Sequence, residues 1–371
     1  MLTRVILSIN IIIFLWNLNH VFGQFATNFK CNESKQSDEY VRDVKIYINE
    51  VSEYLNSKST RVVDLSTIGL GFLSDGDFIG SSYRHISSLN LSRNVVKSIS
   101  FGLILRYPNL QELDLSQNCL TSLDVKHRII FRNLSSLNVS RNSITNIHPF
   151  TFSNVSLEVV DLSHNHLIRF LAADFEIRQL YINDNKLTQI EIDSGHRKEL
   201  KILDTSNNNL KIVQINVDLS NLILSNNQLT MDEYFRIRNV YGTLDMSRNY
   251  ISEFNWKFIS CVTNLDISHN QFTTFHVECP SKRFQRIKRL NLNGNFLCNF
   301  NDAQNITKCF PNLKFISIMH NRLNKIQKIN IKSTLSKLKV KSQMFDYDVH
   351  PITLCDDDDC DAFNIFFKKF E

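Results

Sequence analysis

Two cysteines near the carboxyl end of the chain, Cys355 and Cys360, enclose four consecutive aspartates, Asp356 to Asp359. Carboxylate oxygens are the ligands that calcium prefers. Calcium-binding loops, however, space their ligands so that several oxygens converge on one ion, and four adjacent side chains cannot all point the same way. We therefore predict no calcium site in this acidic segment.

Two histidines, His164 and His166, are the other candidate ligands, because an extended segment would place both on one side. Zinc needs a tetrahedral set of ligands, and no third ligand accompanies this pair. The chain also has no Gly-x-Ser-x-Gly, no His-Glu-x-x-His and no phosphate-binding glycine loop, and it has only nine glycines. We expect a protein with no metal, no cofactor and no enzymatic activity.

The dominant pattern in the sequence is an internal repeat. The segments Leu110 to Leu120 and Leu134 to Ile144 share the template L-x-x-L-x-L-x-x-N-x-L, which is the leucine-rich-repeat signature. A degenerate unit around Val63 to Leu65 precedes the regular ones. Anchored on its asparagine, the template recurs in steps of 19 to 26 residues at Asn94, Asn118, Asn142, Asn165, Asn185, Asn208, Asn227, Asn249, Asn270, Asn295 and Asn321.

Each repeat is expected to contribute one short strand. Apolar residues at template positions 4 and 6 point into the solenoid, and the asparagine at position 9 satisfies backbone groups at the turn. The predicted fold is an α/β repeat solenoid, a leucine-rich-repeat horseshoe of about 11–12 repeats with a parallel sheet on its concave face. Recurrent phenylalanines should pack the convex side: Phe131, Phe152, Phe175, Phe258 and Phe310. We place a signal peptide at 1–23, an amino-terminal cap at 24–60, the solenoid at 61–330 and a carboxyl-terminal cap at 331–371.

Template positions 3, 5 and 7 face outward, where partners are expected to bind. Position 5 is mostly Asp or Asn, and an exposed polar sheet face explains this simply. Four consecutive strands depart from the pattern with outward apolar or aromatic groups: Val159, Tyr181, Ile202 and Ile223. A contiguous patch of such residues would form a partner-binding site, whereas scattered single exposures would have no function.

The amino terminus has the pattern of a secretory signal peptide. Arg4 precedes an apolar run from Val5 to Trp16, and a cleavage site follows Gly23. The run is too short to span a bilayer comfortably, so we expect a secreted, extracellular glycoprotein with no membrane span. Glycans on Asn90 and Asn138, which occupy position 5, would cover the amino-terminal part of the concave face and direct binding towards the middle and carboxyl-terminal strands. Six Asn-x-Ser/Thr sequons agree with secretion: Asn32, Asn90, Asn133, Asn138, Asn154 and Asn305.

Eight cysteines in an oxidising compartment predict disulfide bonds. Cys298 and Cys309 are expected to pair, because no cysteine lies between them. A bridge between Cys261 and Cys279, in adjacent repeats, is a second prediction. Cys119 lies at template position 10 and is expected to be partly exposed.

The carboxyl-terminal cap leaves alternatives open. Cys355 and Cys360 either close a small loop or bond to a second chain, and Cys31 has no evident neighbour to pair with. A short amphipathic helix is predicted after them, which either docks on the last repeat or binds a partner. Its apolar face would consist of Phe363, Phe366, Phe367 and Phe370.

Charge is segregated along the chain. The net charge is +5, but the segment from Lys282 to Lys341 holds fourteen Lys and Arg against Asp302 alone, and the last thirty residues carry a net charge of −6. The basic end attracts an acidic glycan, an anionic cell or microbial surface or an acidic protein, or it is a solvated face, or the acidic segment folds back on it. Secretion argues against nucleic acid. The predicted basic surface consists of Arg283, Arg286, Arg289, Lys325 and Lys328.

Several features together resemble the mosquito leucine-rich immune proteins: the signal peptide, the repeats anchored on asparagine, the segment Gly294 to Cys298, and the Cys355–Cys360 pair with its Phe363-led helix. Long members of that family carry a carboxyl-terminal coiled coil and form disulfide-linked complexes that stabilise a complement-like thioester protein. This chain ends where such a coil would begin, so it is similar to a short member. The resemblance implies that Cys355 or Cys360 would bond a partner chain. The ectodomain of Toll receptors is a second resemblance.

The sequence therefore predicts a secreted leucine-rich-repeat binding protein. Its expected role is that of an innate-immune recognition or scaffold factor acting through protein–protein contacts in extracellular fluid. The alternative is an extracellular adhesion, guidance or matrix protein that binds a protein or an acidic glycan. Tight binding to sulfated glycans through the basic end would favour the alternative.

Overall fold

The structure is a computed structural model that describes residues 61–67, 70–71, 84–99, 107–123, 133–148, 151–152, 155–170, 176–193, 200–277, 284–300 and 306–343. The predicted signal peptide, amino-terminal cap, acidic cysteine pair and Phe363-led helix lie outside these residues. By its contacts the chain divides into two compact units, one of residues 1–186 and 195–199 and the other of residues 187–194 and 200–371.

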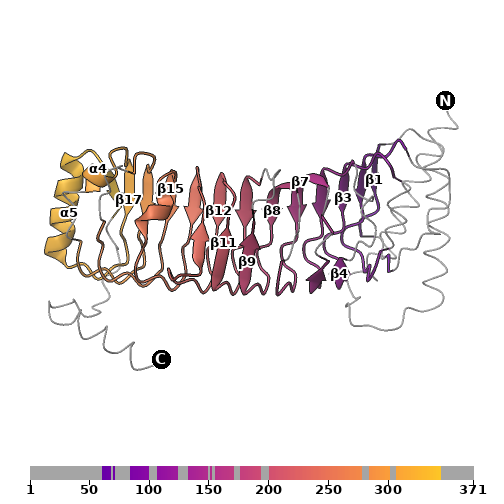
Figure 1. Cartoon of the computed structure of the whole chain (residues 1–371), viewed down its shortest axis with the longest axis horizontal. Coiled ribbons are helices and arrows are strands. Elements are labelled where there is room, and N and C mark those ends of the chain that lie inside the picture. Colours follow the sequence, from indigo (N-terminus) through magenta and orange to yellow (C-terminus); the bar gives the residue numbers. More distant parts are fainter. Residues whose placement is uncertain are drawn as a thin grey trace, which may run out of the picture. The chain divides into compact units, whose positions relative to one another are not determined.

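The first unit contains a parallel sheet with the strand order β1-β2-β3-β5-β7-β8. The strands of this sheet follow one another in chain order, as expected for a solenoid (Figure 1). A short parallel pair, β4 and β6, lies outside this sheet. The strands are β1 (Val62–Asp64), β2 (Ser88–Asn90), β3 (Glu112–Asp114), β4 (Ser122–Leu123), β5 (Ser136–Asn138), β6 (Asn146–Ile147), β7 (Ser156–Asp161) and β8 (Glu176–Tyr181).

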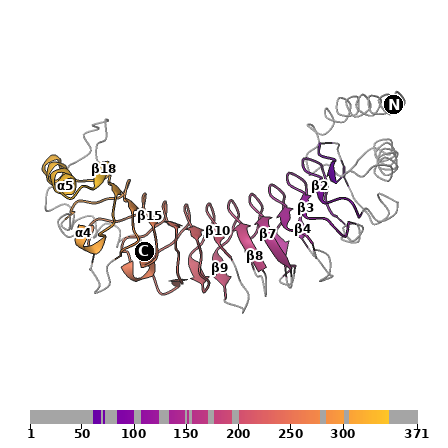
Figure 2. The ribbon, with the colours of Figure 1, turned by 90° about the horizontal axis from the view of Figure 1, so that it is seen from above.

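The second unit repeats this arrangement with the strand order β10-β12-β14-β15-β16-β17-β18. A separate parallel sheet, β13-β11-β9, lies on the other side of the unit, as the places of β9 and β10 in Figure 2 show. The elements are β9 (Gln189–Ile192), β10 (Ile202–Asp204), β11 (Ile212–Ile215), β12 (Asn221–Ile223), β13 (Phe235–Ile237), β14 (Thr243–Asp245), the 3-10 helix η1 (Trp256–Ile259), β15 (Asn264–Asp266), β16 (Arg289–Asn291), α4 (Ile306–Cys309), β17 (Phe315–Ser317), α5 (Lys325–Lys337) and β18 (Lys341–Gln343).

The core is built from the residues at template positions 4 and 6. At β3 these are Leu113 within the strand and Leu115 directly after it, and at β16 they are Leu290 and Leu292 in the same places, all at most 2% exposed. Alternation along a strand turns both inward while the residues between them face solvent. The strands are in register across each sheet, so that Leu89 lies beside Leu113 and Leu265 beside Leu290. This confirms the predicted parallel-sheet solenoid.

The template asparagine forms a ladder of hydrogen bonds inside each unit. Asn142 is typical: its Nδ2 donates to the carbonyl oxygens of Leu115 and Val139, both at 3.0 Å, and its Oδ1 accepts from the backbone N–H of Leu120 at 3.0 Å. Asn249 makes the equivalent bonds in the second unit. Because buried backbone groups need partners, each asparagine ties one repeat to its predecessor, as the sequence analysis predicted.

The residue before each of these asparagines has a left-handed backbone. Its φ is 53° at His164, 56° at Arg248 and 63° at Gly294. The N–H of this residue donates to the next repeat, for example from Arg248 to the carbonyl of Ser268 at 2.9 Å. The turn that leads to each template asparagine therefore has this conformation, which side-chain-bearing residues adopt at some energetic cost.

Aromatic residues pack the side of the second unit away from the seven-stranded sheet. Trp256 of η1 makes edge contacts with Phe275 and tilted contacts with Phe284 and Phe310, and Phe310 is completely buried. In the first unit Phe152 is 1% exposed. The predicted packing role is thus confirmed at Phe152 and Phe310, whereas Phe131 and Phe175 lie outside the described residues.

α5 crosses the predicted boundary between the solenoid at 61–330 and the carboxyl-terminal cap at 331–371. Asn324 caps this helix: its side chain accepts from the N–H of Gln327 at 2.8 Å, and the Gln327 side chain accepts from the N–H of Asn324 at 2.9 Å. β18 then pairs with β17. The described part of the predicted cap therefore continues the repeat sheet.

Candidate functional site

The Asp and Asn residues at position 5 of the strands cap their own turns. In β3 the Oδ1 of Asp114 accepts from the N–H of Ser116 at 2.8 Å, and Asp266 of β15 does the same for Ser268 at 2.9 Å. Side chains that bond to the backbone two residues later stabilise turns of this kind. The position-5 row is thus structural, and the residues available to a partner lie mainly at other positions.

The four apolar residues predicted to form a binding patch face outward, and all are half-buried. In the first unit Val159 is in register with Gln179, whereas Tyr181 is in register with Asp161. In the second unit Ile202 aligns with Asn221, and Asp204 aligns with Ile223. Within each unit the two apolar residues are therefore diagonal neighbours on adjacent strands and not directly opposite each other. The Tyr181 hydroxyl donates to Oε1 of Gln179 at 3.1 Å.

His164 and His166 lie on either side of a ladder asparagine. Nε2 of His164 is 3.4 Å from a guanidinium nitrogen of Arg141 and 3.7 Å from Oδ2 of Asp184, so this ring belongs to a surface row of polar side chains. His166 is exposed. Within the described residues, no group of three or more His, Cys, Asp or Glu side chains is arranged to hold a metal ion.

In the second unit the same row carries basic and aromatic side chains, which the sequence analysis did not single out. Burial, and then the charge of Arg248, lower the pKa of His269, while the Asp266 carboxylate opposes them. Two residues further along each turn, Tyr250 is 53% exposed, and the Arg322 guanidinium lies 4.7 Å from the ring centre of Phe296. In the sequence, Arg and His recur directly before the template asparagines, and this recurrence could have predicted the row.

The predicted basic surface divides into separate groups. Arg289 is the exposed first residue of β16, and the Arg286 guanidinium lies 5.5 Å from the ring centre of Tyr241. Lys325 and Lys328 are on α5, and Arg283 lies outside the described residues. Three exposed lysines at the amino-terminal ends of strands belong to the predicted basic segment but were not among the five residues singled out in it, namely Lys288, Lys314 and Lys341.

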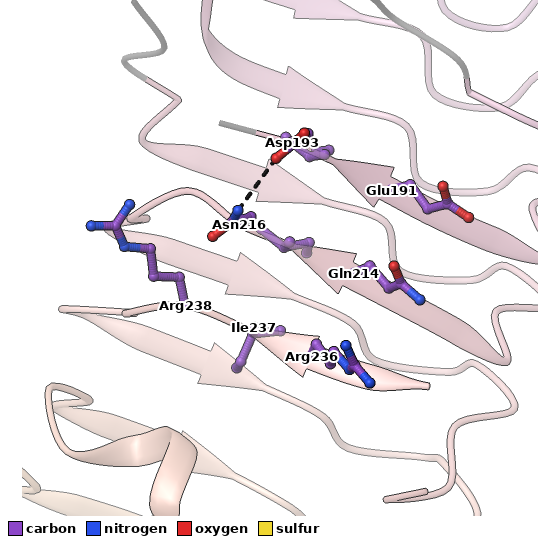
Figure 3. A pocket seen from close by; sticks show the side chains of 9 residues that line it. Glu191, Asp193, Gln214, Asn216, Arg236, Ile237 and Arg238 are labelled. Atoms are coloured by element: carbon purple, nitrogen blue, oxygen red, sulfur yellow. Dashed lines mark hydrogen bonds between the residues drawn. The ribbon is translucent and has the colours of Figure 1, made fainter. Parts of the chain in front are cut away.

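A hollow of about 610 Å³ lies over the sheet β13-β11-β9 (Figure 3). Strand register aligns Glu191 with Gln214 and Gln214 with Arg236, so acidic, amide and basic side chains follow one another across the strands. These groups are largely bonded to each other and to their surroundings. Asn216 donates to Asp193 at 3.3 Å (Figure 3), and Arg238 pairs with Asp218 at 3.1 Å. The hollow is polar and internally compensated, which is typical of a solvated face.

The structure corrects both predicted disulfides among the repeats. Cys261 and Cys298 take no part in a disulfide bond, whereas Cys119 and Cys309 are disulfide-bonded. The Sγ of Cys298 lies 3.5 Å from the carbonyl oxygen of Phe296, and that of Cys309 lies 3.9 Å from the carbonyl oxygen of Val277, so the two sulfur atoms have different surroundings. Proximity in sequence was therefore a poor guide to pairing.

Cys119 also differs from its predicted partial exposure, because it is only 4% exposed. Its N–H donates to the carbonyl of Val96 in the preceding repeat at 2.9 Å. The exposed residue His166 makes the same bond at its own position 10, so this bond does not account for the burial of Cys119. Cys279, Cys355 and Cys360 lie outside the described residues, and so does Cys31.

Three of the predicted sequons fall within the described residues. Asn133 is exposed, and its Nδ2 donates to the carbonyl of Pro108 at 2.6 Å. Asn90 and Asn138 are half-buried and cap the turns at Ser92 and Ser140. Glycan attachment at these positions stays a prediction. The remaining sequons, Asn32, Asn154 and Asn305, lie outside the described residues.

No helix in the described part of the chain is long and apolar enough to cross a membrane. The described residues likewise show no nucleophile held by a base and an orienting group, which is the arrangement that covalent catalysis needs.

Comparisons with known proteins agree with this fold. Residues 132–176 and 109–127 each match a family model for leucine-rich repeats. The leucine-rich-repeat domain of APL1B has a TM-score of 0.58 at 20% identity, with 86% of this chain and 95% of that chain covered. The APL1 leucine-rich-repeat domain has a TM-score of 0.53 at 22% identity, with 81% and 84% covered.

A relative in Caenorhabditis elegans, immunoglobulin domain and leucine-rich repeat-containing protein 2, is 31% identical over 176 residues. The match covers 46% of this chain and 21% of that protein, so this chain spans only a small part of the relative. Together with the asparagine ladders, these matches show that the chain is a leucine-rich-repeat protein whose fold resembles that of the mosquito leucine-rich immune proteins APL1B and APL1.

Proposed function

We propose that this protein is secreted and acts in extracellular fluid as an innate-immune recognition or scaffold factor that binds a protein partner. The proposal rests on the outward face of the repeat sheet in each unit. Most position-5 residues are Asp or Asn that cap their turns. The variable residues of that face are therefore those at position 3 and the few apolar residues that replace Asp or Asn at position 5. Regular backbone with variable outward side chains is how repeat proteins build binding surfaces.

Tyr181 and Ile223 are the exceptions at position 5 itself. Where their neighbours Asp161 and Asp204 carry capping carboxylates, these two residues place apolar surface outward. Aromatic and aliphatic side chains in such settings are typical anchors of protein interfaces. They are therefore the residues that we expect a protein partner to contact in each unit.

Secretion is supported by disulfide chemistry as well as by the amino-terminal sequence. Cys119 and Cys309 are disulfide-bonded, and structural disulfides persist mainly in oxidising compartments. The exposed sequon residue Asn133 fits the same route. Analysis of the secreted chain for a cleaved amino terminus and for glycan on Asn133 would test this part of the proposal.

Site-specific cross-linking tests the proposed contact face. A photoreactive phenylalanine analogue replaces Tyr181 or Ile223 in the full chain, and the secreted protein is irradiated in extracellular fluid. Matched controls carry the analogue at Ile168 or Tyr234, which are exposed to 54% and 49% but lie outside the repeat sheets. A cross-linked protein formed at the sheet positions alone supports the proposal. Cross-links at the control positions alone, or at none of the four, contradict it.

The family resemblance adds a more specific proposal, that the chain is linked to its partner by a disulfide bond. Cys355 or Cys360 would form the bond. A reducible complex on a non-reducing gel that disappears when both residues are changed to Ser would support this link. A monomer in every lane would exclude the covalent complex and leave the non-covalent contact face to the cross-linking test.

A second candidate function is extracellular adhesion or matrix binding through an acidic glycan. The exposed cations at the starts of β16, β17 and β18 favour it, because the described residues 284–300 and 306–343 contain no Asp or Glu. The two functions are separable, since the apolar exceptions and these cations are different residues.

A further inference from the structure

Four exposed cations line the amino-terminal ends of three adjoining strands in the second unit. Arg289 begins β16 and Lys341 begins β18, while Lys288 and Lys314 directly precede β16 and β17. All four side chains are exposed. We call these four residues the cationic strip.

Backbone hydrogen bonds fix the order of the strip. The N–H of Lys314 donates to the carbonyl of Lys288 at 2.9 Å, and the N–H of Lys341 donates to the carbonyl of Lys314 at 3.0 Å. Arg289 is in register with Phe315, and Phe315 is in register with Lys341. Neighbouring strands are roughly 4.8 Å apart, so the strip presents positive charge at each step across three strands.

Within the described residues of this segment, no acidic side chain balances the positive charges of the cationic strip. The described residues 284–300 and 306–343 contain no Asp or Glu. The ion pairs of the described chain join His164 to Asp184, Arg178 to Glu158 and Arg238 to Asp218, and none involves the strip. The hollow over β13-β11-β9 is different, because there the basic side chain of Arg238 has its own carboxylate.

Like charges held this close repel one another, and an anion from outside the chain would relieve the repulsion. Lys325 at the start of α5 adds a further exposed cation beyond these strands. A linear arrangement of cations, in contrast to a single pocket, suits a ligand that carries several anionic groups along its length.

The composition of the cationic strip favours an anionic polymer over a folded protein as its ligand. Lysine is depleted at the centres of protein interfaces, where aromatic and apolar anchors carry the binding energy. Phe315, which is half-buried, lies between Arg289 and Lys341 in the strand register, and Val340, which directly precedes Lys341, is only 5% exposed. Point charges on flexible stems bind repeating anions without needing a shaped pocket.

We propose that the cationic strip binds a linear anionic polysaccharide, one with sulfate or carboxylate groups along its length, which crosses β16, β17 and β18. This site depends on the extracellular location in the proposed function and not on the protein partner. The polysaccharide lies across the strands, so that successive anionic groups meet Lys288, Lys314 and Lys341 in turn.

The test measures binding of the purified, secreted full chain to heparin by calorimetry at several salt concentrations. The strip variant is Lys288→Gln, Lys314→Gln and Lys341→Gln together. Its matched control is Lys186→Gln, Lys201→Gln and Lys211→Gln, which removes the same charge from exposed lysines elsewhere. Far-UV circular dichroism and thermal melting of both variants check that the fold is unchanged.

We expect the strip variant to bind heparin at least about tenfold more weakly, and the slope of log affinity against log salt to fall by about two, as counterion release predicts. The control should change affinity less than about threefold. Equal losses in the two variants would mean that net charge alone attracts heparin, which would overturn the proposal. Size-matched neutral dextran should not bind.

Two further probes distinguish other ligands. Tighter binding of polyglutamate than of heparin by the intact strip would assign the site to an acidic protein and overturn the proposal of a polysaccharide ligand.

A variant with Asp356 to Asp359 changed to Asn tests whether the acidic segment of the chain covers the cationic strip. Heparin binding seen in that variant alone would overturn the proposal in favour of an internal contact. Cross-linking at Tyr181 or Ile223 is unaffected by any of these outcomes, so the two proposals fail independently.

Discussion

The imidazole of His269 lies against the backbone of Gly294 in the next repeat. A Cβ atom on residue 294 would be 2.6 Å from Cε1 of His269 and would also overlap Nδ1. Gly294 has a φ of 63°, but the equivalent residues Arg248 and His320 adopt 56° and 53° with full side chains. The close approach of the ring therefore disfavours a side chain at residue 294 in addition to the strain of the left-handed turn, which Arg248 and His320 tolerate.

Replacing Gly294 with Ala should destabilise the second unit by about 1–3 kcal/mol, because either the ring or the turn must move. The double variant Gly294→Ala with His269→Ala removes the obstructing ring and should recover most of that loss. Urea unfolding of the two single variants and the double variant gives the coupling energy. Additive effects in this cycle would show that the overlap with His269 is not the cause.

The spacing of leucines and asparagines was enough to predict the strands and the buried ladder, because those residues recur in every repeat and their environment is the same each time. The features that differ from one repeat to the next were harder to predict. The sheet β13-β11-β9 depends on short stretches such as Glu191 and Ile192, whose alternation is too brief to distinguish from coil. Cysteine pairing failed for a related reason, since Cys298 and Cys309 are near in sequence but face different surroundings.

The candidate contact residues were only partly predictable. Tyr181 and Ile223 stood out because they break the position-5 pattern, but their diagonal placement required the strand register. Lys288 and Lys314 precede their strands, so a template centred on the strand residues passed over them. Their alignment became visible through hydrogen bonds between repeats that lie 26 residues apart in sequence.

Asn142 provides a test of the ladder in the first unit. Asn142→Ala should cost about 2–4 kcal/mol, because it leaves the carbonyl oxygens of Leu115 and Val139 and the N–H of Leu120 without their partner in a buried turn. Hydrogen exchange at Leu120 should accelerate in the same variant. Asn209→Ala, at an exposed position next to a ladder asparagine in the second unit, should change stability by less than about 0.5 kcal/mol. Equal effects of the two substitutions would contradict the structural role of the ladder.

His269 should make stability depend on pH. Burial and the charge of Arg248 hold its pKa below 6.5, with Asp266 opposing and His320 adding to the shift. As the pH falls below 6.5, the unfolded chain takes up a proton before the folded chain does, so the free energy of unfolding decreases until the pH is below the folded pKa. The difference in stability between the wild type and His269→Gln should therefore shrink or reverse between pH 7.5 and pH 5. His166→Gln, at an exposed position, is the control, and a constant difference for His269→Gln over this range would refute the linkage.

Asp245 should have the opposite dependence on pH. Burial raises its pKa above 3.8 against the hydrogen bond from the N–H of Ser247, and the nearby Asp266 raises it further. The folded chain holds this proton to a higher pH than the unfolded chain does, so the contribution of the group is fully present below pH 3.8 and is lost as the pH rises through the folded pKa.

Asp245→Asn cannot ionise, yet it can still cap the turn, because Asn90 and Asn138 accept from Ser92 and Ser140 at the same template position. The variant should thus be more stable than the wild type at pH 7, with the gap closing as the pH approaches 3.8. Asp64→Asn, which alters an exposed cap on Ser66, should change stability little at either pH. Thermal melting of both variants at pH 7 and pH 4 measures the difference. A loss of stability at pH 7 in Asp245→Asn would mean that the carboxylate charge is needed in the fold, and that its interactions with Ser247 outweigh the cost of burial.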